Sequence, residues 1–157
     1  MGAILSIDFG TKRIGLAVSD STRTFAFPYG TIENKNHEYV FLNIKNIISE
    51  KEVDLIIIGM PYRRGIPMCM PTGKKAEKQR NRETEKSKKV SMEDIISSFV
   101  NKLRERVNIP VEIVDEKLSS FAAEENLKES GISSKEIKRF VDQEAARLIL
   151  LEFLQNR

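Results

Sequence analysis

Three acidic residues stand where the sequence changes from an apolar run to a turn or a helix. The presence of carboxylates at these positions needs an explanation. Asp8 lies at the end of the apolar run 3–9, directly before a glycine-containing turn. A carboxylate at the end of a half-buried strand is costly unless something offsets its charge. Glu116 follows a later strand-like run, and Asp142 stands near the start of the last helical stripe. If the fold brings the three together, they predict a site for a hard divalent cation.

Two kinds of chemistry suit Asp8 in this setting. Two divalent ions held about 3.5–4 Å apart by carboxylates activate a water and stabilise the leaving oxygen of a phosphodiester. The segment Asp8-Phe9-Gly10-Thr11 also resembles the first phosphate loop of nucleotide-dependent phosphotransferases of the actin and hexokinase superfamily. Those proteins need a second glycine-rich phosphate loop, and the sequence contains no later segment of that kind. Metal-dependent chemistry on a phosphodiester is therefore the favoured hypothesis.

Each acidic residue also has a simpler role open to it. Asp8 could accept hydrogen bonds from the backbone of its own turn. Glu116 could be a solvated charge after a strand, and Asp142 could be present because acidic residues favour the amino-terminal turn of a helix. The residues alone leave these alternatives open, but the shared framework of strands and helices favours the metal site.

The apolar pattern predicts the elements that must position these acids. Short apolar runs indicate strands at 3–9, 13–19, 24–32, 53–59 and 110–115. Apolar residues at helical spacing indicate helices at 37–51, 91–106, 119–129 and 141–154. Strands that follow one another directly imply antiparallel neighbours, and strands separated by helices imply parallel ones. We therefore expect an α/β fold with a mixed five-stranded sheet flanked by helices, and ligands at the carboxyl ends of its strands.

The segment from about 62 to 90 is strongly basic, with ten lysines and arginines against three acidic residues. A long segment with few apolar residues inside a compact domain is usually functional or disordered. Concentrated positive charge suits a polyanionic partner. We expect one domain over residues 1–157 that carries this segment as a flexible, nucleic-acid-binding insertion, with an ordinary solvated loop as the alternative. The basic residues singled out there are Arg63, Arg64, Lys74 and Lys75.

The composition excludes several other classes of protein. Hydrophobic residues make up 40% and charged residues 31% of the 157 positions, as in ordinary globular domains. Apolar runs such as Leu55–Met60 are far too short to cross a bilayer, and the amino terminus has no signal-peptide pattern. A single cysteine, Cys69, excludes an internal disulfide and a multi-cysteine zinc site. We therefore expect a cytoplasmic protein without a membrane partner.

Four blocks of the sequence resemble the YqgF/RuvX family, and together they cover almost the whole chain apart from the basic insertion. These blocks are 7–20 (IDFGTKRIGLAVSD), 56–61 (IIIGMP), 111–127 (VEIVDEKLSSFAAEENL) and 141–154 (VDQEAARLILLEFL). The resemblance implies a ribonuclease H-like fold related to RuvC-type Holliday junction resolvases. It also implies that Asp8, Glu116 and Asp142 are the catalytic acids that bind Mg²⁺ or Mn²⁺, with Asp115 as an accessory or structural acid.

The family resemblance also implies a function. The family is described as a nuclease that matures the 5′ end of pre-16S ribosomal RNA during ribosome biogenesis, with Holliday junction resolution as an older proposal. A non-catalytic RNA-binding assembly factor with the same fold is a further alternative. The partner is then nucleic acid, either pre-rRNA or branched DNA, and the choice between a monomer and a homodimer stays open.

Basic residues beside the acids are expected to contact phosphate. Lys12 and Arg13 lie in the turn next to Asp8, and Lys117 follows Glu116 directly. The family usually has arginine at position 117, so the lysine here keeps the charge but loses the planar fork that binds phosphate bidentately.

Overall fold

The computed structural model describes residues 1–61, 90–116, 128–129, 131 and 133–157, without the side chains of Glu116 and of several residues in 134–139. Its elements are β1 (Ala3–Phe9), β2 (Arg13–Ser19), β3 (Ala26–Glu33), α1 (His37–Glu50), β4 (Val53–Pro61), α2 (Met92–Arg104), β5 (Val111–Glu116) and α4 (Ser134–Gln155).

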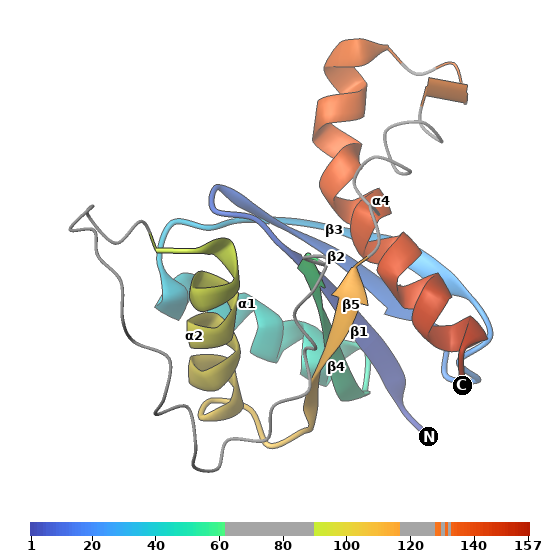
Figure 1. The fold of residues 1–157 in the computed structure, drawn as a ribbon. Helices are drawn as coiled ribbons and strands as arrows, with labels where there is room; N and C mark the ends of the chain where they lie inside the picture. The colour runs from blue at the N-terminus through green and yellow to red at the C-terminus, as the bar shows by residue number, and fades with distance from the viewer. Residues whose placement is uncertain (62–89, 117–127, 130, 132) are drawn as a thin grey trace, which may run out of the picture.

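The five strands form one mixed sheet in the order β3-β2-β1-β4-β5 (Figure 1). β1 and β2 form an antiparallel hairpin, and β3 continues this meander along β2. β4 lies parallel to β1 on its other side, and β5 lies parallel to β4. The predicted mixed five-stranded α/β sheet is therefore confirmed, and the carboxyl ends of β1, β4 and β5 lie at the same end of the sheet.

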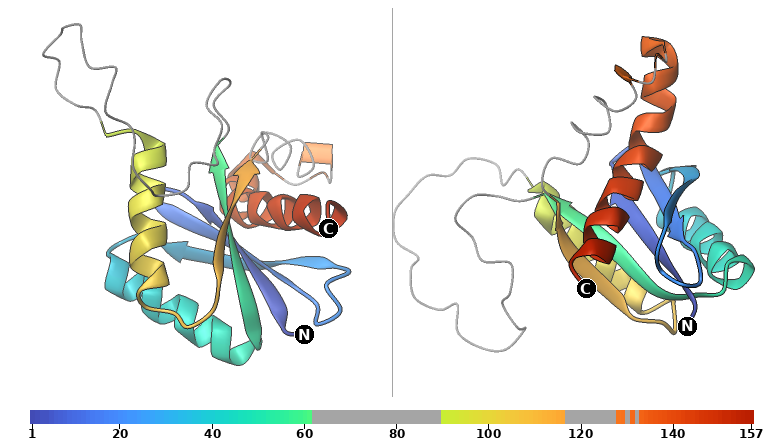
Figure 2. Two further views of the ribbon diagram at one scale, coloured as in Figure 1. Left: turned by 60° about the horizontal axis from the view of Figure 1, so that its bottom comes forward. Right: turned by 90° about the vertical axis from the view of Figure 1, so that its right-hand side faces the viewer.

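Helices cover both faces of the sheet (Figures 1 and 2). α1 and α2 lie on one face, where the rings of Phe41 and Phe99 have centroids 5.5 Å apart above apolar side chains of the strands. α4 lies on the opposite face, where Ala146 and Ile149 share a buried cluster with Ala17 of β2. β1 and β4 are buried on both faces, and for this reason they read as nearly continuous apolar runs in the sequence.

Local capping signals determine where α1 and α2 begin. The side chain of Asn36 accepts a hydrogen bond from the backbone N–H of Tyr39 at 2.8 Å and caps α1. Ser91 and Asp94 form a capping box for α2, with Asp94 N donating to the Ser91 hydroxyl at 3.2 Å and Ser91 N donating to the Asp94 carboxylate at 3.3 Å. A side-chain cap of this kind contributes about 1 kcal/mol. Because Ser91 is the N-cap of α2, the predicted helix start at Ser91 is confirmed.

α4 begins earlier than the apolar stripe at 141–154 predicts. Its first residue is Ser134, about two turns before that stripe. The stripe marks the part of the helix that contacts the sheet, whereas the preceding turns extend beyond the sheet (Figure 1). Periodicity therefore located the packed face of α4 and not its start.

Other sequence predictions fall partly outside the described residues. The helix expected at 119–129 and the basic insertion at about 62–90 lie almost entirely in the undescribed segments, and the single-domain organisation stays a prediction. β3 is an edge strand, the place in a sheet where a proline such as Pro28 is tolerated. None of the described helices is long and apolar enough to cross a membrane.

Candidate active site

Asp8 lies at the carboxyl end of β1, immediately before the turn to β2. Its backbone pairs directly with Gly15 of β2, and the residue is partly buried. Directly paired residues of an antiparallel pair share one face of the sheet, with Cβ positions about 4.5–5.5 Å apart. Because position 15 carries no side chain, another element can approach the sheet beside Asp8.

α4 makes this approach with the backbone of Asp142. A Cβ atom built on Gly15 would lie 1.9 Å from the carbonyl oxygen of Asp142 and 2.9 Å from the backbone nitrogen of Gln143. No side chain fits there, so Gly15 is what lets α4 rest directly on β2. Together with the pairing of Gly15 and Asp8, this contact puts the backbone of Asp142 within about 7 Å of the Asp8 Cβ position. The structure therefore brings these two predicted acids together.

Asp142 lies in about the third turn of α4 and not at the helix start. The backbone N–H groups there bond within the helix, so the preference of acidic residues for a helix amino terminus does not apply. The alternative in which Asp142 is present because acidic residues favour the amino-terminal turn of a helix is therefore wrong. Its position is set by the contact with Gly15 instead.

Asp142 forms an ion pair with Arg13, the first residue of β2. Nε of Arg13 donates to Oδ2 of Asp142 at 2.7 Å, and the two side chains are 50% and 23% exposed, respectively. Arg13 and Gly15 are two positions apart in one strand and therefore share the face on which α4 lies. The sequence predicted that Arg13 contacts nucleic acid; in the structure its guanidinium binds a carboxylate of the candidate site.

Asn34 holds the turn between β1 and β2, a role that the sequence does not reveal. Its backbone N–H donates to the carbonyl oxygen of Lys12 at 2.9 Å, and its Nδ2 donates to that of Gly10 at 2.9 Å. Lys12 itself is exposed. An asparagine after an edge strand gives no signal for this role. By contrast, a glycine within the strand-like run 13–19 is a recognised sign of close backbone approach.

β5 brings the acidic pair Asp115 and Glu116 to the same end of the sheet as Asp8. Ile58 of β4 pairs with Ile7 of β1 on one side and with Ile113 of β5 on the other. The acidic pair therefore lies just beyond this level, toward the carboxyl end. β4 alone separates β5 from β1, so the two strands are about 10 Å apart.

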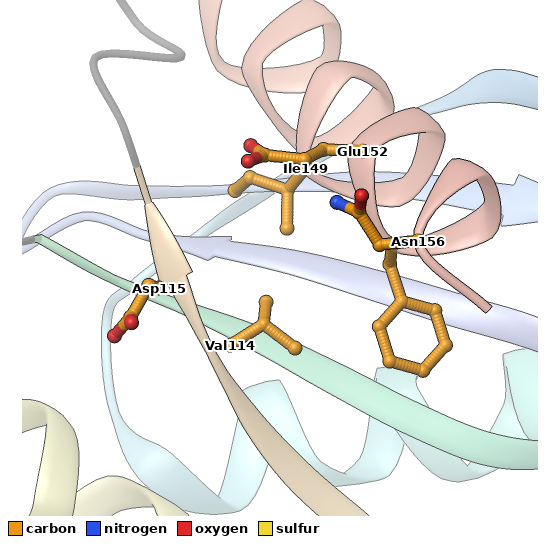
Figure 3. A pocket seen from close by; sticks show the side chains of 6 residues that line it. Val114, Asp115, Ile149, Glu152 and Asn156 are labelled. Atoms are coloured by element: carbon orange, nitrogen blue, oxygen red, sulfur yellow. The ribbon is translucent and has the colours of Figure 1, made fainter.

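The two acids of β5 differ in register. Asp115 pairs with Met60, which is buried beneath α1 and α2, so Asp115 belongs to the face opposite α4. Figure 3 shows its carboxylate on the other side of the strand from Val114. Glu116 pairs with Pro61, and its side chain lies outside the described set. Predicted phosphate-binding residues that also lie outside it are Lys117, Arg63, Arg64, Lys74 and Lys75.

A small cavity of about 230 Å³ lies between β5 and the last turns of α4 (Figure 3). It is smaller than the roughly 300–1,000 Å³ of typical small-molecule sites. Neither Asp8 nor Asp142 lines it, so this cavity is distinct from the site of the two acids. Its lining residues are Val114, Asp115, Ile149, Glu152, Phe153 and Asn156.

Ser6 adds an unsatisfied polar group close to Asp8. It is fully buried and lies two positions before Asp8 in β1, on the same face of the sheet. Within the described part of the chain, its hydroxyl has no hydrogen-bond partner. Such a buried hydroxyl costs about 1–3 kcal/mol, so this region is not optimised for stability alone.

Asp8 and Asp142 fit a hard divalent cation by their donor chemistry. Mg²⁺ is commonly held by one or two carboxylates together with waters and phosphate oxygens. Across the residues that the structure describes, no three His, Cys, Asp or Glu side chains gather into a metal site. A third carboxylate would have to come from Glu116, whose side chain is not part of that set.

Two solved structures of resolvases share the arrangement of the sheet and helices. Thermus thermophilus RuvC in complex with a Holliday junction substrate matches with a TM-score of 0.53 at 11% identity, covering 99% of this chain and 96% of that one. Fowlpox virus resolvase with Holliday junction DNA matches with a TM-score of 0.52 at 12% identity, covering 98% and 97%. The chain therefore has the ribonuclease H-like fold of the resolvases, as expected.

Sequence comparisons identify the family. The RuvX family model, described as "Holliday junction resolvase", matches residues 2–156. A protein from Maridesulfovibrio salexigens named "Putative pre-16S rRNA nuclease" is 36% identical over 151 residues, 96% of each chain. A protein of the same name from Methylobacillus flagellatus is 31% identical over 156 residues, 99% of this chain and 92% of that one. The chain belongs to the RuvX family.

Proposed function

We propose that the chain is a divalent-metal-dependent nuclease, using Mg²⁺ or Mn²⁺, that matures the 5′ end of pre-16S ribosomal RNA. The observation that supports this most directly is the contact of Gly15 with Asp142, which puts Asp142 beside Asp8 at the carboxyl end of β1. The names of the two relatives suggest the substrate. Because the precursor RNA is made and processed in the cytoplasm, we propose that location for the protein.

The chain's own contribution in this proposal is to hold carboxylates in fixed positions. Asp8 is held by strand pairing in the middle of the sheet, and Asp142 is held by its contact with Gly15 and its ion pair with Arg13. Glu116 would add the third acid from across β4. A bound divalent ion supplies the acidity that activates a water and the charge that stabilises phosphate oxygens. Asp115, on the opposite face, is not one of the proposed metal ligands.

Basic residues around this end of the sheet would position the nucleic acid. Lys12 is exposed in the turn beside Asp8, and Lys117 follows Glu116 in the sequence. We propose that these lysines and the basic insertion contact phosphates, which fixes orientation and carries little sequence information. The insertion residues in this role are Arg63, Arg64, Lys74 and Lys75.

Cleavage of branched DNA is the second candidate function. It is favoured by the description of the family model and by the two resolvase structures with junction DNA. A resolvase must present two active sites to a two-fold symmetric junction and therefore needs a homodimer, whereas trimming one RNA end does not. The oligomeric state consequently differs between the two candidates.

The test uses the full chain with a labelled pre-16S rRNA leader and, separately, a labelled four-way DNA junction, each with Mg²⁺, with Mn²⁺ or with a chelator. We expect metal-dependent cleavage of the RNA and a loss of about 10³-fold or more in Glu116→Gln. Glu112→Gln, an exposed position on the same strand away from its carboxyl end, is the matched control and should retain cleavage.

Each other outcome changes the assignment. Cleavage of the junction alone would transfer the function to the second candidate. Salt-sensitive RNA binding without cleavage under either metal would identify a non-catalytic RNA-binding factor and overturn the nuclease proposal.

A further inference from the structure

Asp142 is paired with a cation of its own chain at the place where a metal ion is proposed to bind. Nε of Arg13 donates to Oδ2 of Asp142 at 2.7 Å. The bond is charge-assisted on both sides, a type that is shorter and stronger than a neutral hydrogen bond. A role for Arg13 in binding phosphate would require its guanidinium to leave this carboxylate or to be shared with it.

The geometry distinguishes this pair from an ordinary surface ion pair. Exposed pairs contribute little because two long side chains must be held in one arrangement. Here Gly15, two positions after Arg13 in the same strand, contacts the backbone of Asp142 at a distance that admits no side chain. One backbone contact therefore fixes the origins of both side chains. Asp142 is also only 23% exposed, so solvent screens its charge incompletely.

The charge of Arg13 also acts on the site as a whole. Asp8 and Asp142 bring two negative charges to one end of the sheet, and their potential is what attracts a divalent cation. A guanidinium bonded to one of these carboxylates lowers that potential and occupies one of its oxygens. A metal ion at this site would therefore have to displace Arg13 from Asp142 or share that carboxylate with it.

We propose that Arg13 is a positioning residue that holds Asp142 in the metal-free protein and competes with the divalent ion for this carboxylate. The inference rests on the proposed function, because it assumes that the metal binds Asp8 and Asp142. It makes an unusual prediction: loss of a side chain that contacts the site tightens metal binding. A purely structural role of Arg13 predicts the opposite, since a misplaced Asp142 would bind metal more weakly.

The experiment is a titration of the metal-free full chain with Mn²⁺, in which free Mn²⁺ is followed by electron paramagnetic resonance and no nucleic acid is present. Arg13→Gln removes the charge and keeps a polar side chain, and we expect its Mn²⁺ dissociation constant to fall about tenfold. Lys12→Gln is the matched control, because it removes the same charge from the adjacent exposed position. We expect it to change the constant by less than about twofold, because the exposed charge is screened.

Two further variants keep the test decisive. Arg13→Ala is a second neutral substitution and should tighten Mn²⁺ binding to a similar extent; thermal unfolding in chelator shows that each variant is folded. Arg13→Lys keeps the charge and loses the fork, so its dissociation constant should stay between those of the wild type and Arg13→Gln.

The outcomes separate this inference from the proposed function. Unchanged or weaker Mn²⁺ binding by folded Arg13→Gln and Arg13→Ala would overturn the competition, as would equal tightening by Lys12→Gln. If Asp8→Asn still weakens Mn²⁺ binding in the same assay, the proposed function survives that result. Wild-type Mn²⁺ binding that does not depend on Asp8 would overturn both.

Discussion

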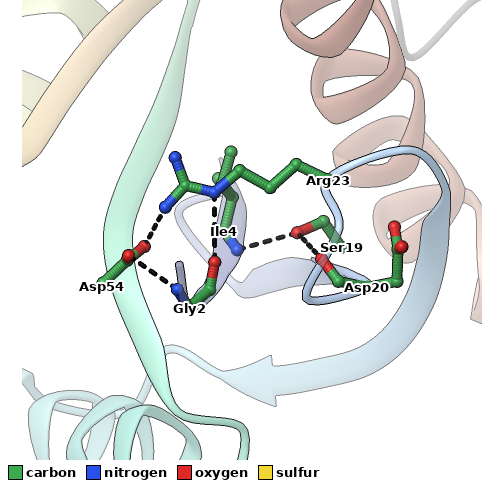
Figure 4. A network of polar contacts seen from close by, with 6 residues as sticks. All are labelled: Gly2, Ile4, Ser19, Asp20, Arg23 and Asp54. Atoms are coloured by element: carbon green, nitrogen blue, oxygen red, sulfur yellow. Dashed lines mark hydrogen bonds and ion pairs between the residues drawn. The ribbon is translucent and has the colours of Figure 1, made fainter.

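The two ends of the sheet differ in how many carboxylates they bring together. At the amino-terminal end of β1, Asp54 accepts hydrogen bonds from the backbone N–H of Gly2 at 2.8 Å and from the guanidinium of Arg23 (Figure 4). Nε of Arg23 also donates to the carbonyl oxygen of Gly2 at 3.1 Å, which closes the network. The bond from Gly2, followed by the charge of Arg23, lowers the pKa of Asp54. At the carboxyl-terminal end Asp142 is likewise paired with an arginine, Arg13, but there a second carboxylate, that of Asp8, lies at the same end of the sheet.

The amino-terminal end contains a second closed network (Figure 4). The hydroxyl of Ser19 accepts from the backbone N–H of Ile4 and donates to the carbonyl oxygen of Asp20, both at 2.9 Å. The hydroxyl of Thr22 and the backbone N–H of Phe25 donate to the Asp20 carboxylate. Polar groups at this end are therefore paired within closed networks, whereas toward the other end two acids lie together and, among the described residues, the buried hydroxyl of Ser6 has no hydrogen-bond partner.

Gly15→Ala should have the largest effect on stability, because it disrupts the contact between Gly15 and the backbone of Asp142 that brings α4 to the site. The new methyl group would meet the backbone of Asp142, which cannot move aside as a flexible side chain would. We expect the free energy of unfolding to fall by about 3 kcal/mol or more, and cleavage to fall as α4 moves away from β2. Urea denaturation measures the first effect. A change below about 0.5 kcal/mol would contradict the close contact from which the site is derived.

Asp54→Ala tests the opposite end. It removes the shared acceptor of Gly2 and Arg23, and we expect a loss of about 1–2 kcal/mol of unfolding free energy. The loss stays modest because the Asp54 side chain is 44% exposed. Cleavage, assayed well below the melting temperature, should be unchanged because the network lies far from Asp8. Loss of cleavage in the folded variant would show that the two ends are not independent.

Two serines on one face of the sheet form a matched pair whose substitution by alanine should change the free energy of unfolding in opposite directions. Both Ser6 and Ser19 are buried, but the structure gives hydrogen-bond partners to Ser19 and, among the described residues, none to Ser6. Ser6→Ala should raise the free energy of unfolding by up to about 1 kcal/mol, and Ser19→Ala should lower it by about 1 kcal/mol. Urea denaturation of both variants decides this. Equal losses would mean that the hydroxyl of Ser6 is satisfied after all.

Asp20→Ala should have the smallest effect and a characteristic pH dependence. Hydrogen bonds, led by that from Thr22, lower the pKa of Asp20 from 3.8 to about 2 in the folded chain. The carboxylate therefore stabilises the fold above about pH 4, and this contribution is lost as the pH falls through about 2. The melting temperature of the variant should lie below that of the wild type at neutral pH, with the gap shrinking from pH 4 to pH 2. Circular dichroism measures the melting temperatures of both proteins. A gap that stays constant from pH 4 to pH 2 would contradict the lowered pKa of Asp20.

The strands of the sheet and the position of Asp8 can be predicted from the sequence because both follow from local patterns. The hairpin 3–9/13–19 is confirmed, and Asp8 ends β1 as predicted. The partner of Asp142 could not be predicted in this way, because Arg13 precedes it by 129 residues and the pair meets only when α4 packs on β2. Gly15 is the intermediate case: a glycine within a strand signals close approach, but only the structure identifies α4 as the approaching element.

The most direct test of the site is a comparison of Asp8→Asn with Asp54→Asn in one metal-dependent cleavage assay on the labelled pre-16S rRNA leader. Both substitutions neutralise an aspartate of the sheet, one at each end. We predict a loss of about 10³-fold or more in Asp8→Asn with its unfolding midpoint preserved, and cleavage within about twofold of the wild type in Asp54→Asn. Wild-type cleavage by Asp8→Asn would contradict the assignment of the active site to this end of the sheet.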